Sequence, residues 1–140
     1  MPSPFLERLS RGPLVADGAM GTQLYGRGVS FEHCFDELNL SRPTLVEAVH
    51  RDYLVAGAEL IETNTFGANA VRLATHGLGD QVRLIARQGA RVARAAREIV
   101  GRDAFVAGSI GPLGKPLQPF GHILVPDAEG YFRTTAEGLL

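Results

Sequence analysis

Polar side chains that can bind or transfer charge follow each of three short apolar runs in this 140-residue chain. Asp17 comes after the first run, Glu62, Thr63 and Asn64 end the second, and Ser109 ends the third. If the runs are parallel strands, their carboxyl ends meet at one edge of a sheet, where the active sites of α/β barrels gather. We therefore expect these residues to share one site.

Each of these residues also has a purely structural interpretation. Asp17 can cap a helix that begins at residue 19 or 20, Thr63 can bond loop backbone, and the neighbouring glycines can simply permit turns. For any one residue the structural interpretation is favoured. The occurrence of all of them at strand ends favours a binding site.

The elements that would position these residues alternate between strands and helices. Helical periodicity and end signals predict four helices, which cover residues 43–56, 69–75, 80–100 and 127 onward. Apolar runs predict three strands, at residues 14–16, 59–63 and 104–109. Strands separated by helices pair in parallel with right-handed crossovers, so the predicted class is α/β. A loop rich in glycine and proline, residues 111–126, follows the third strand.

Four segments of the chain carry a family resemblance, which covers nearly its whole length. In order and spacing they resemble the homocysteine S-methyltransferase family, most closely the homocysteine domain of bacterial methionine synthase and of fusions with a methylenetetrahydrofolate reductase domain. The segments are Asp17-Gly18-Ala19-Met20-Gly21-Thr22, Phe35-Asp36-Glu37-Leu38-Asn39-Leu40-Ser41-Arg42-Pro43, Glu62-Thr63-Asn64-Thr65-Phe66-Gly67-Ala68 and Gly108-Ser109-Ile110-Gly111-Pro112.

The resemblance implies a fold larger than this chain. A complete (β/α)8 TIM barrel needs eight strands and about 250 residues. Residues 1–140 are therefore expected to be a homocysteine-binding domain that is incomplete at its C-terminus, the N-terminal portion of a barrel with about three βα units. We interpret the sequence as a fragment of a longer protein.

The resemblance also implies transfer of a methyl group to the sulfur of homocysteine, which gives methionine. Family members activate the thiol with zinc held by three cysteines from later strands, and those positions would lie beyond Leu140. We therefore expect no catalytic residue and no metal ligand in this chain, and the isolated 140 residues should be inactive. A zinc site made of His33, Cys34 and His50 would be an unusual ligand set, and His122 is left without a role.

The part that this chain would contribute is a cradle for the amino-acid end of homocysteine. Backbone N–H groups of the loop from Gly18 to Gly21 would receive the carboxylate, and Glu62 would meet the ammonium group. A buried Glu62 bonded to neighbouring backbone is an equal alternative. The expected substrate-binding residues are Asp17, Gly18, Ala19, Met20, Gly21, Glu62, Thr63 and Asn64.

Charge and hydropathy exclude several other partners. The net charge of −1 gives no reason to expect a nucleic acid, and the basic stripe of a predicted helix is interpreted as its solvated face (Arg83, Arg87, Arg91, Arg94 and Arg97). No apolar stretch is long enough for a membrane span. With one cysteine and no signal peptide, a cytoplasmic location is expected. The expected partners are homocysteine and a methyl donor or donor-bearing domain, with a cobalamin- or folate-linked methyl group, betaine or a sulfonium compound as donor.

Two other functions remain open at this point. The first is a different barrel enzyme that holds a phosphate in its glycine-rich turns. The second is a non-catalytic truncated product, or an amino-acid-binding fragment that lacks the zinc site.

Overall fold

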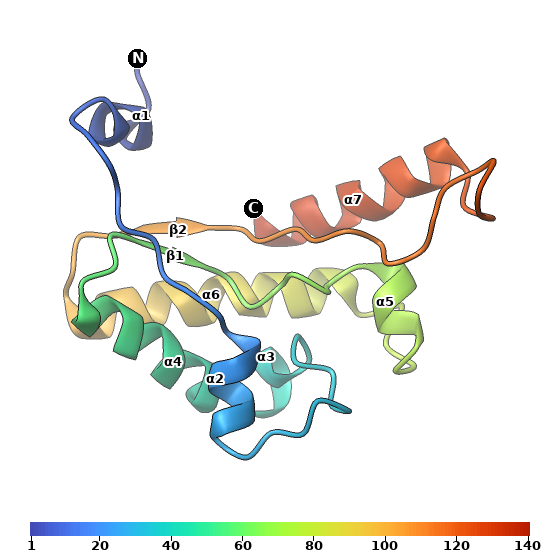
Figure 1. Ribbon diagram of the computed structural model, residues 1–140, viewed down its shortest axis with the longest axis horizontal. Coiled ribbons are helices and arrows are strands. Elements are labelled where there is room, and N and C mark those ends of the chain that lie inside the picture. The colour runs from blue at the N-terminus through green and yellow to red at the C-terminus, as the bar shows by residue number, and fades with distance from the viewer.

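The computed structural model describes residues 1–140 and contains seven helices and two strands (Figure 1). In chain order they are α1 (Pro4–Leu9), α2 (Gly21–Gly26), α3 (Leu38–Ser41), α4 (Pro43–Ala56), β1 (Leu60–Glu62), α5 (Ala70–Ala74), α6 (Val82–Val100), β2 (Phe105–Ala107) and α7 (Val125–Leu139). The α/β class is confirmed.

The sheet is small and parallel. β1 pairs with β2 with Ile61 opposite Val106. The predicted first strand, residues 14–16, was wrong as a full strand, because only Ala16 forms a parallel bridge, with Leu60. Pro13 has no N–H to donate, and the chain turns into a loop after Asp17, which donates to the carbonyl of Leu60 at 2.9 Å. The segment still lies along the free edge of β1.

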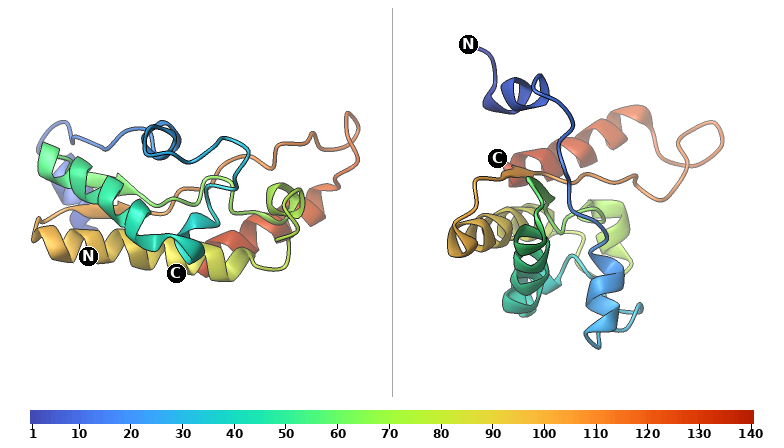
Figure 2. Two further views of the ribbon diagram at one scale, coloured as in Figure 1. Left: turned by 90° about the horizontal axis from the view of Figure 1, so that it is seen from below. Right: turned by 60° about the vertical axis from the view of Figure 1, so that its left-hand side comes forward.

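The long helices α4 and α6 lie on the same side of the strands, and α7 continues that layer (Figure 2). Ile61 is fully buried and belongs to a core cluster with Leu54 of α4 and with Ala93 and Ala96 of α6. Its neighbour Glu62 points to the other face and is exposed. Because only the face that carries Ile61 is buried, a ligand can reach the strand residues of the opposite face, such as Glu62.

Most predicted helices were confirmed, with small shifts at their ends. α4 has the predicted bounds, and Gly57 ends it with a φ of 117°, which is unfavourable for residues that have a Cβ. α6 begins at Val82 rather than at Asp80, and α7 begins at Val125 rather than at Asp127. The short helices α1 and α3 were not predicted, and a helix near α2 was considered only in the structural interpretation of Asp17.

The buried face of α7 differs from the prediction. The pattern placed Phe132, Ala136, Leu139 and Leu140 on one packed face, but Phe132 is 37% exposed and Leu140 fully exposed. The helix instead buries Ala128, Thr135 and Gly138. A Cβ at Gly138 would lie 2.9 Å from Cβ of Ala86, so small residues let α7 approach α6 closely.

The basic stripe of α6 faces away from the core, as predicted for four of its five arginines. Arg83 pairs with Glu137 of α7, and Arg87, Arg91 and Arg94 are exposed. Arg97 is partly buried and donates to the carbonyl of Ala104 at 3.2 Å. None of the helices is both long and apolar enough to cross a membrane.

Candidate functional site

An open cleft of about 790 Å³ lies at the carboxyl ends of the strands. The loops that follow the first strand segment, β1 and β2 all contribute to it, as do residues 31 and 33–36 before α3. Every residue predicted to bind substrate lines this cleft: Asp17, Gly18, Ala19, Met20, Gly21, Glu62, Thr63 and Asn64. Ser109, the polar residue predicted at the end of the third strand, lines it as well.

Asp17 is tied to the end of β1. Its Oδ2 accepts a hydrogen bond of 3.0 Å from the backbone N–H of Glu62. Partial burial raises the pKa of the Asp17 carboxyl, and the negative charge of Glu62 raises it further, whereas the hydrogen bond from Glu62 N–H lowers it. Asp17 does not cap α2, because Met20 is the cap residue of that helix and no side chain bonds there.

The loop from Gly18 to Gly21 lines the cleft. The N–H groups of Gly18, Ala19, Met20 and Gly21 donate to no other backbone group. The loop is held from behind by Tyr53 of α4, whose hydroxyl donates to the carbonyl of Ala19 at 2.7 Å. A Cβ at Gly18 would lie 3.1 Å from that hydroxyl, so glycine lets the helix support the loop at close range.

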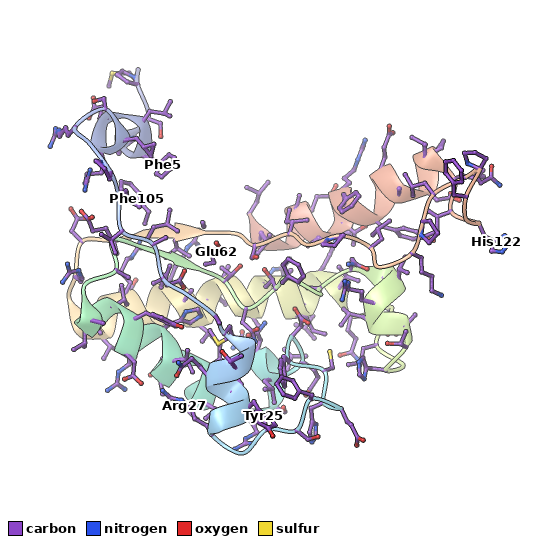
Figure 3. The ribbon with its side chains drawn as sticks, in the orientation of Figure 1. Phe5, Tyr25, Arg27, Glu62, Phe105 and His122 are labelled. Atoms are coloured by element: carbon purple, nitrogen blue, oxygen red, sulfur yellow. The ribbon has the colours of Figure 1, made fainter.

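Glu62 is exposed, and its carboxylate makes no hydrogen bond within the chain (Figure 3). The alternative of a buried glutamate bonded to backbone is therefore wrong. The backbone N–H of Glu62 is used by Asp17, and this contact keeps the two acidic residues together at one end of the cleft.

Thr63 lines the cleft with little exposed surface, because its hydroxyl belongs to an internal chain of hydrogen bonds. The hydroxyls of Thr63 and Thr65 lie 2.6 Å apart, and Thr65 donates to the carbonyl of Ser109 at 2.7 Å. Since that bond uses the hydrogen of Thr65, Thr63 donates to Thr65 and accepts from the N–H of Ser109 at 3.0 Å. These bonds join the loop after β1 to the loop after β2.

The side chain of Asn64 also forms hydrogen bonds inside the protein, in its case to the segment before α3 and to α3 itself. Its Nδ2 donates to the carbonyl of Phe35 at 2.8 Å and to Oδ1 of Asn39 at 3.2 Å. Asn39 returns a bond of 2.7 Å from its Nδ2 to the carbonyl of Asn64. Both residues are at most 6% exposed, so they position the cleft wall and offer little polar surface to a ligand.

Sequence reasoning did not single out Asp36 or Arg72, which both line the cleft. Oδ1 of Asp36 accepts from the N–H of Gly67 at 2.9 Å. Burial raises the pKa of the Asp36 carboxyl, while the charges of Arg72 and His76 lower it. Asp36 belongs to one of the four segments that resemble the family, and this was the only feature of the sequence that pointed to Asp36 as a residue of the site. No feature of the sequence pointed to Arg72, because nothing in the local sequence shows that α5 borders the cleft.

The sequence model of the family described as "Homocysteine S-methyltransferase" matches residues 14–140. The chain belongs to the homocysteine S-methyltransferase family. The match includes every residue of the acidic end of the cleft and of the loop from Gly18 to Gly21.

Among curated relatives, "Methionine synthase" of Mycobacterium tuberculosis is 36% identical over 144 residues, which cover 96% of this chain and 12% of the relative. "Methionine synthase" of Mycobacterium leprae is 38% identical, with the same shares covered. The metallated form of the homocysteine methyltransferase MmuM from Escherichia coli has a TM-score of 0.81 at 27% identity, over 98% of this chain and 53% of MmuM. The chain thus spans a small part of the methionine synthases and about half of MmuM.

The residues of this family member do not fit a zinc centre. No group of three or more His, Cys, Asp or Glu side chains is arranged to hold a metal ion. His50 is buried in the core with neither ring nitrogen hydrogen-bonded. Partial burial raises the pKa of the Cys34 thiol, which disfavours the thiolate that a metal needs.

The loop after β2 forms a second cavity with α5 and α7, of about 550 Å³. His122 lies on its outer turn, away from the acidic end of the first cleft (Figure 3). The structure gives His122 no partner and no place beside the predicted substrate residues.

Proposed function

We propose that the complete protein is a homocysteine S-methyltransferase and that this chain supplies its amino-acid-binding part. One observation carries the proposal: two acidic residues and a loop whose backbone N–H groups donate to no other backbone group line one cleft, in a chain of this family. An amino acid carries the complementary pair of charges. The same donors would also suit a phosphate, but two adjacent carboxylates disfavour a ligand that is only anionic.

In this proposal the ammonium group of homocysteine lies against Glu62, with Asp17 beside it. The substrate carboxylate accepts from N–H groups between Gly18 and Gly21. Charge-assisted bonds of this kind are stronger than neutral ones and fix direction as well as affinity. Binding the amino-acid end in this way leaves the thiol free to point into the remaining volume of the cleft.

The thiol itself must be activated, because a free thiol with a pKa of about 8.5 is mostly protonated near neutral pH. A bound zinc ion would supply this by deprotonating the sulfur. The residues of this chain form no such site, so no step of activation is assigned to them. We place the zinc ligands of the complete protein outside residues 1–140.

We infer that the strand layer is an arc of a (β/α)8 barrel. The support is the arrangement of the helices, since α4, α6 and α7 cover only one side of the strands (Figure 2). The strand face that carries Glu62 would then point into the barrel mouth. We also propose a cytoplasmic location, which is supported by the single cysteine of the sequence.

Isothermal titration of homocysteine into the purified protein tests the proposal. We expect Glu62→Gln to weaken binding by about tenfold or more, the usual effect of losing one charge-assisted hydrogen bond. Glu98→Gln, on the exposed side of α6, is the matched control and should leave the affinity unchanged. Equal affinities of the wild type and Glu62→Gln for homocysteine would show that Glu62 does not bind the substrate.

Assays of methionine formation separate binding from catalysis. The isolated 140 residues, supplied with zinc and with each candidate methyl donor, should bind homocysteine without producing methionine. Zinc-dependent methionine formation by this chain alone would contradict the placement of the metal ligands elsewhere. Binding without turnover even in the complete protein would instead favour a non-catalytic amino-acid-binding function.

A further inference from the structure

Tyr53 of α4 contacts the loop from Gly18 to Gly21 without lining the cleft itself. Ala19 and Met20 of this loop line the cleft, whereas Tyr53 does not. The hydroxyl of Tyr53 donates to the carbonyl of Ala19 at 2.7 Å. Tyr53 can therefore act on the loop without occupying the space that the proposed substrate needs.

The ring of Tyr53 is fixed by the core. It packs against two core clusters, of which one contains Leu24 and the other contains Ile61. Its hydroxyl makes one hydrogen bond within the chain, the bond to Ala19. The ring is therefore held on both sides, and the hydroxyl at its end has a single task.

The carbonyl of Ala19 accepts from no backbone N–H. The loop is anchored on one side by Asp17, whose N–H and carboxylate both bond to β1. On the other side, the N–H of Leu24 donates to the carbonyl of Met20 at 3.0 Å, which begins α2. Between these two anchors, the bond from Tyr53 is the hydrogen bond that holds the backbone.

The direction of the Ala19 carbonyl also fixes the direction of the next N–H group. The peptide bond between Ala19 and Met20 is trans, because the one cis bond of the chain precedes Pro119. In a planar trans peptide the C=O and N–H groups point to opposite sides. With its carbonyl directed to Tyr53, this peptide directs the N–H of Met20 away from α4.

The opposite orientation of this peptide would disfavour a bound carboxylate. The carbonyl oxygen of Ala19, which carries partial negative charge, would then point away from α4, and the N–H of Met20 would point toward it. A negative ligand group on the cleft side of the loop would meet an acceptor instead of a donor. The hydroxyl of Tyr53 stabilises the orientation that avoids this.

We propose that Tyr53 is a positioning residue that makes the cleft select a free amino-acid carboxylate. The inference rests on the proposed function, because it assumes that the substrate carboxylate lies against the loop from Gly18 to Gly21. It narrows the substrate class to free amino acids, since a carboxyl group that is amidated, as inside a peptide, carries no charge for the loop to recognise. Tyr53 acts through the peptide between Ala19 and Met20 and touches no substrate group.

Isothermal titration of two ligands into the purified protein tests the selection. The ligands are homocysteine and its carboxamide, which keeps the ammonium and thiol groups but lacks the charged carboxylate. Tyr53→Phe removes the hydroxyl and keeps the ring that packs against the core. Tyr131→Phe in α7 is the matched control, because Tyr131 lines the second cavity and not the cleft.

We expect the wild type to bind homocysteine more tightly than the carboxamide. Tyr53→Phe should weaken the binding of homocysteine by about fivefold, the effect of losing about one hydrogen bond, and should leave the binding of the carboxamide nearly unchanged. A merely structural role of Tyr53 would weaken both ligands by the same factor. The proposal is overturned by that result, or by an affinity of Tyr53→Phe for homocysteine equal to that of the wild type.

Hydrogen exchange in the free protein tests the hold on the loop without any ligand. Residues 18–22 should exchange faster in Tyr53→Phe than in the wild type and in Tyr131→Phe, while residues 104–107 of the third strand segment stay unchanged. Unchanged exchange in residues 18–22 would show that the hydroxyl does not hold the loop and would overturn the proposal. If homocysteine fails to bind the wild type, the proposed function fails and the selection fails with it. If homocysteine binds the wild type and Tyr53→Phe equally, only the role of Tyr53 is contradicted.

Discussion

At the scale of single residues, the cleft depends on buried hydroxyl and amide groups whose hydrogen bonds stay inside the protein. Thr65 is fully buried, accepts from Thr63 and donates to the carbonyl of Ser109. Two loops that follow different strands therefore share one small network. Because such groups are costly to leave unpaired in the interior, the network restricts how the loops are placed.

We predict that Thr65→Val destabilises the protein by about 1–3 kcal/mol, because it leaves the carbonyl of Ser109 without its hydroxyl donor and the hydroxyl of Thr63 without an acceptor. Thr134→Val is the control, since Thr134 makes only an exposed bond to the carbonyl of Gly130 and should change stability by less than about 0.5 kcal/mol. Urea unfolding of the three proteins measures the difference. Equal losses for the two variants would contradict a special role for the buried network.

His50 shows the opposite case, a buried polar side chain without partners. It is fully buried on α4, and neither ring nitrogen is hydrogen-bonded. Burial lowers the pKa of His50 from 6.5 to about 4. In the unfolded chain the imidazole takes up a proton near its ordinary pKa, so acidification favours unfolding. Its contribution to stability is complete above pH 6.5 and is lost as the pH falls toward about 4.

We predict that His50→Leu flattens the dependence of stability on pH between 6.5 and about 4. The full shift corresponds to about 3 kcal/mol, so the variant should be clearly more stable than the wild type at pH 4.5. Denaturant unfolding at several pH values measures this, with the exposed His122→Gln as control. Parallel pH profiles for the wild type and His50→Leu would show that His50 is not buried as a neutral group.

At the scale of elements, the contact of α6 with the loop after β1 depends on one glycine. A Cβ at Gly89 would lie 2.5 Å from Cγ2 of Thr65 and 2.8 Å from Nδ2 of Asn39. Both neighbours are buried and hydrogen-bonded, so they have little freedom to move. Close packing of α6 is therefore coupled to the cleft wall.

We predict that Gly89→Ala destabilises the protein by about 1–3 kcal/mol, although alanine is the better helix former, because overpacking outweighs propensity. Gly130→Ala in α7 is the matched control, because nothing lies within 4 Å of its added Cβ. It should stabilise the protein by up to about 1 kcal/mol. Thermal unfolding of the two variants should thus shift in opposite directions, and a shift in the same direction would contradict the close packing at Gly89.

The long helices and the end of β1 could be predicted from sequence because their signals are local. Gly57 and the periodicity of residues 43–56 define α4 without reference to the rest of the chain. The packed face of α7 could not be predicted in this way, since Gly138 is buried only because Ala86 of α6 lies against it. The position of Arg72 in the cleft could not be predicted for the same reason, because it depends on tertiary contacts with Pro112 and Phe66.

At the scale of the whole molecule, the strands separate two ends with different roles. The cleft lies at their carboxyl ends, and α1 lies near their amino ends (Figure 1). α1 is attached there by Phe5, whose ring meets that of Phe105 edge to face at 5.4 Å, and by Arg8. The Arg8 guanidinium donates to both carboxylate oxygens of Glu59, at 2.8 and 3.0 Å.

The contact with Arg8 makes the attachment of α1 sensitive to pH. The hydrogen bonds from Arg8 hold the pKa of Glu59 below its ordinary value. A lowered pKa means that the interaction is complete above the ordinary pKa of glutamate and is lost as the pH falls through the lowered value. α1 should therefore loosen in acid.

We predict that Glu59→Gln loosens α1 at neutral pH and leaves the cleft unaffected. The amide keeps an oxygen that can accept from the N–H of Val15, as Oε2 does in the wild type, but it loses the charge that attracts Arg8. Hydrogen exchange should become faster in residues 4–9 and stay unchanged in residues 62–67, with Glu98→Gln as control. If the loop after β1 also lost protection, the two ends of the strand layer would be coupled, and α1 would have to be counted among the elements that hold the cleft in shape.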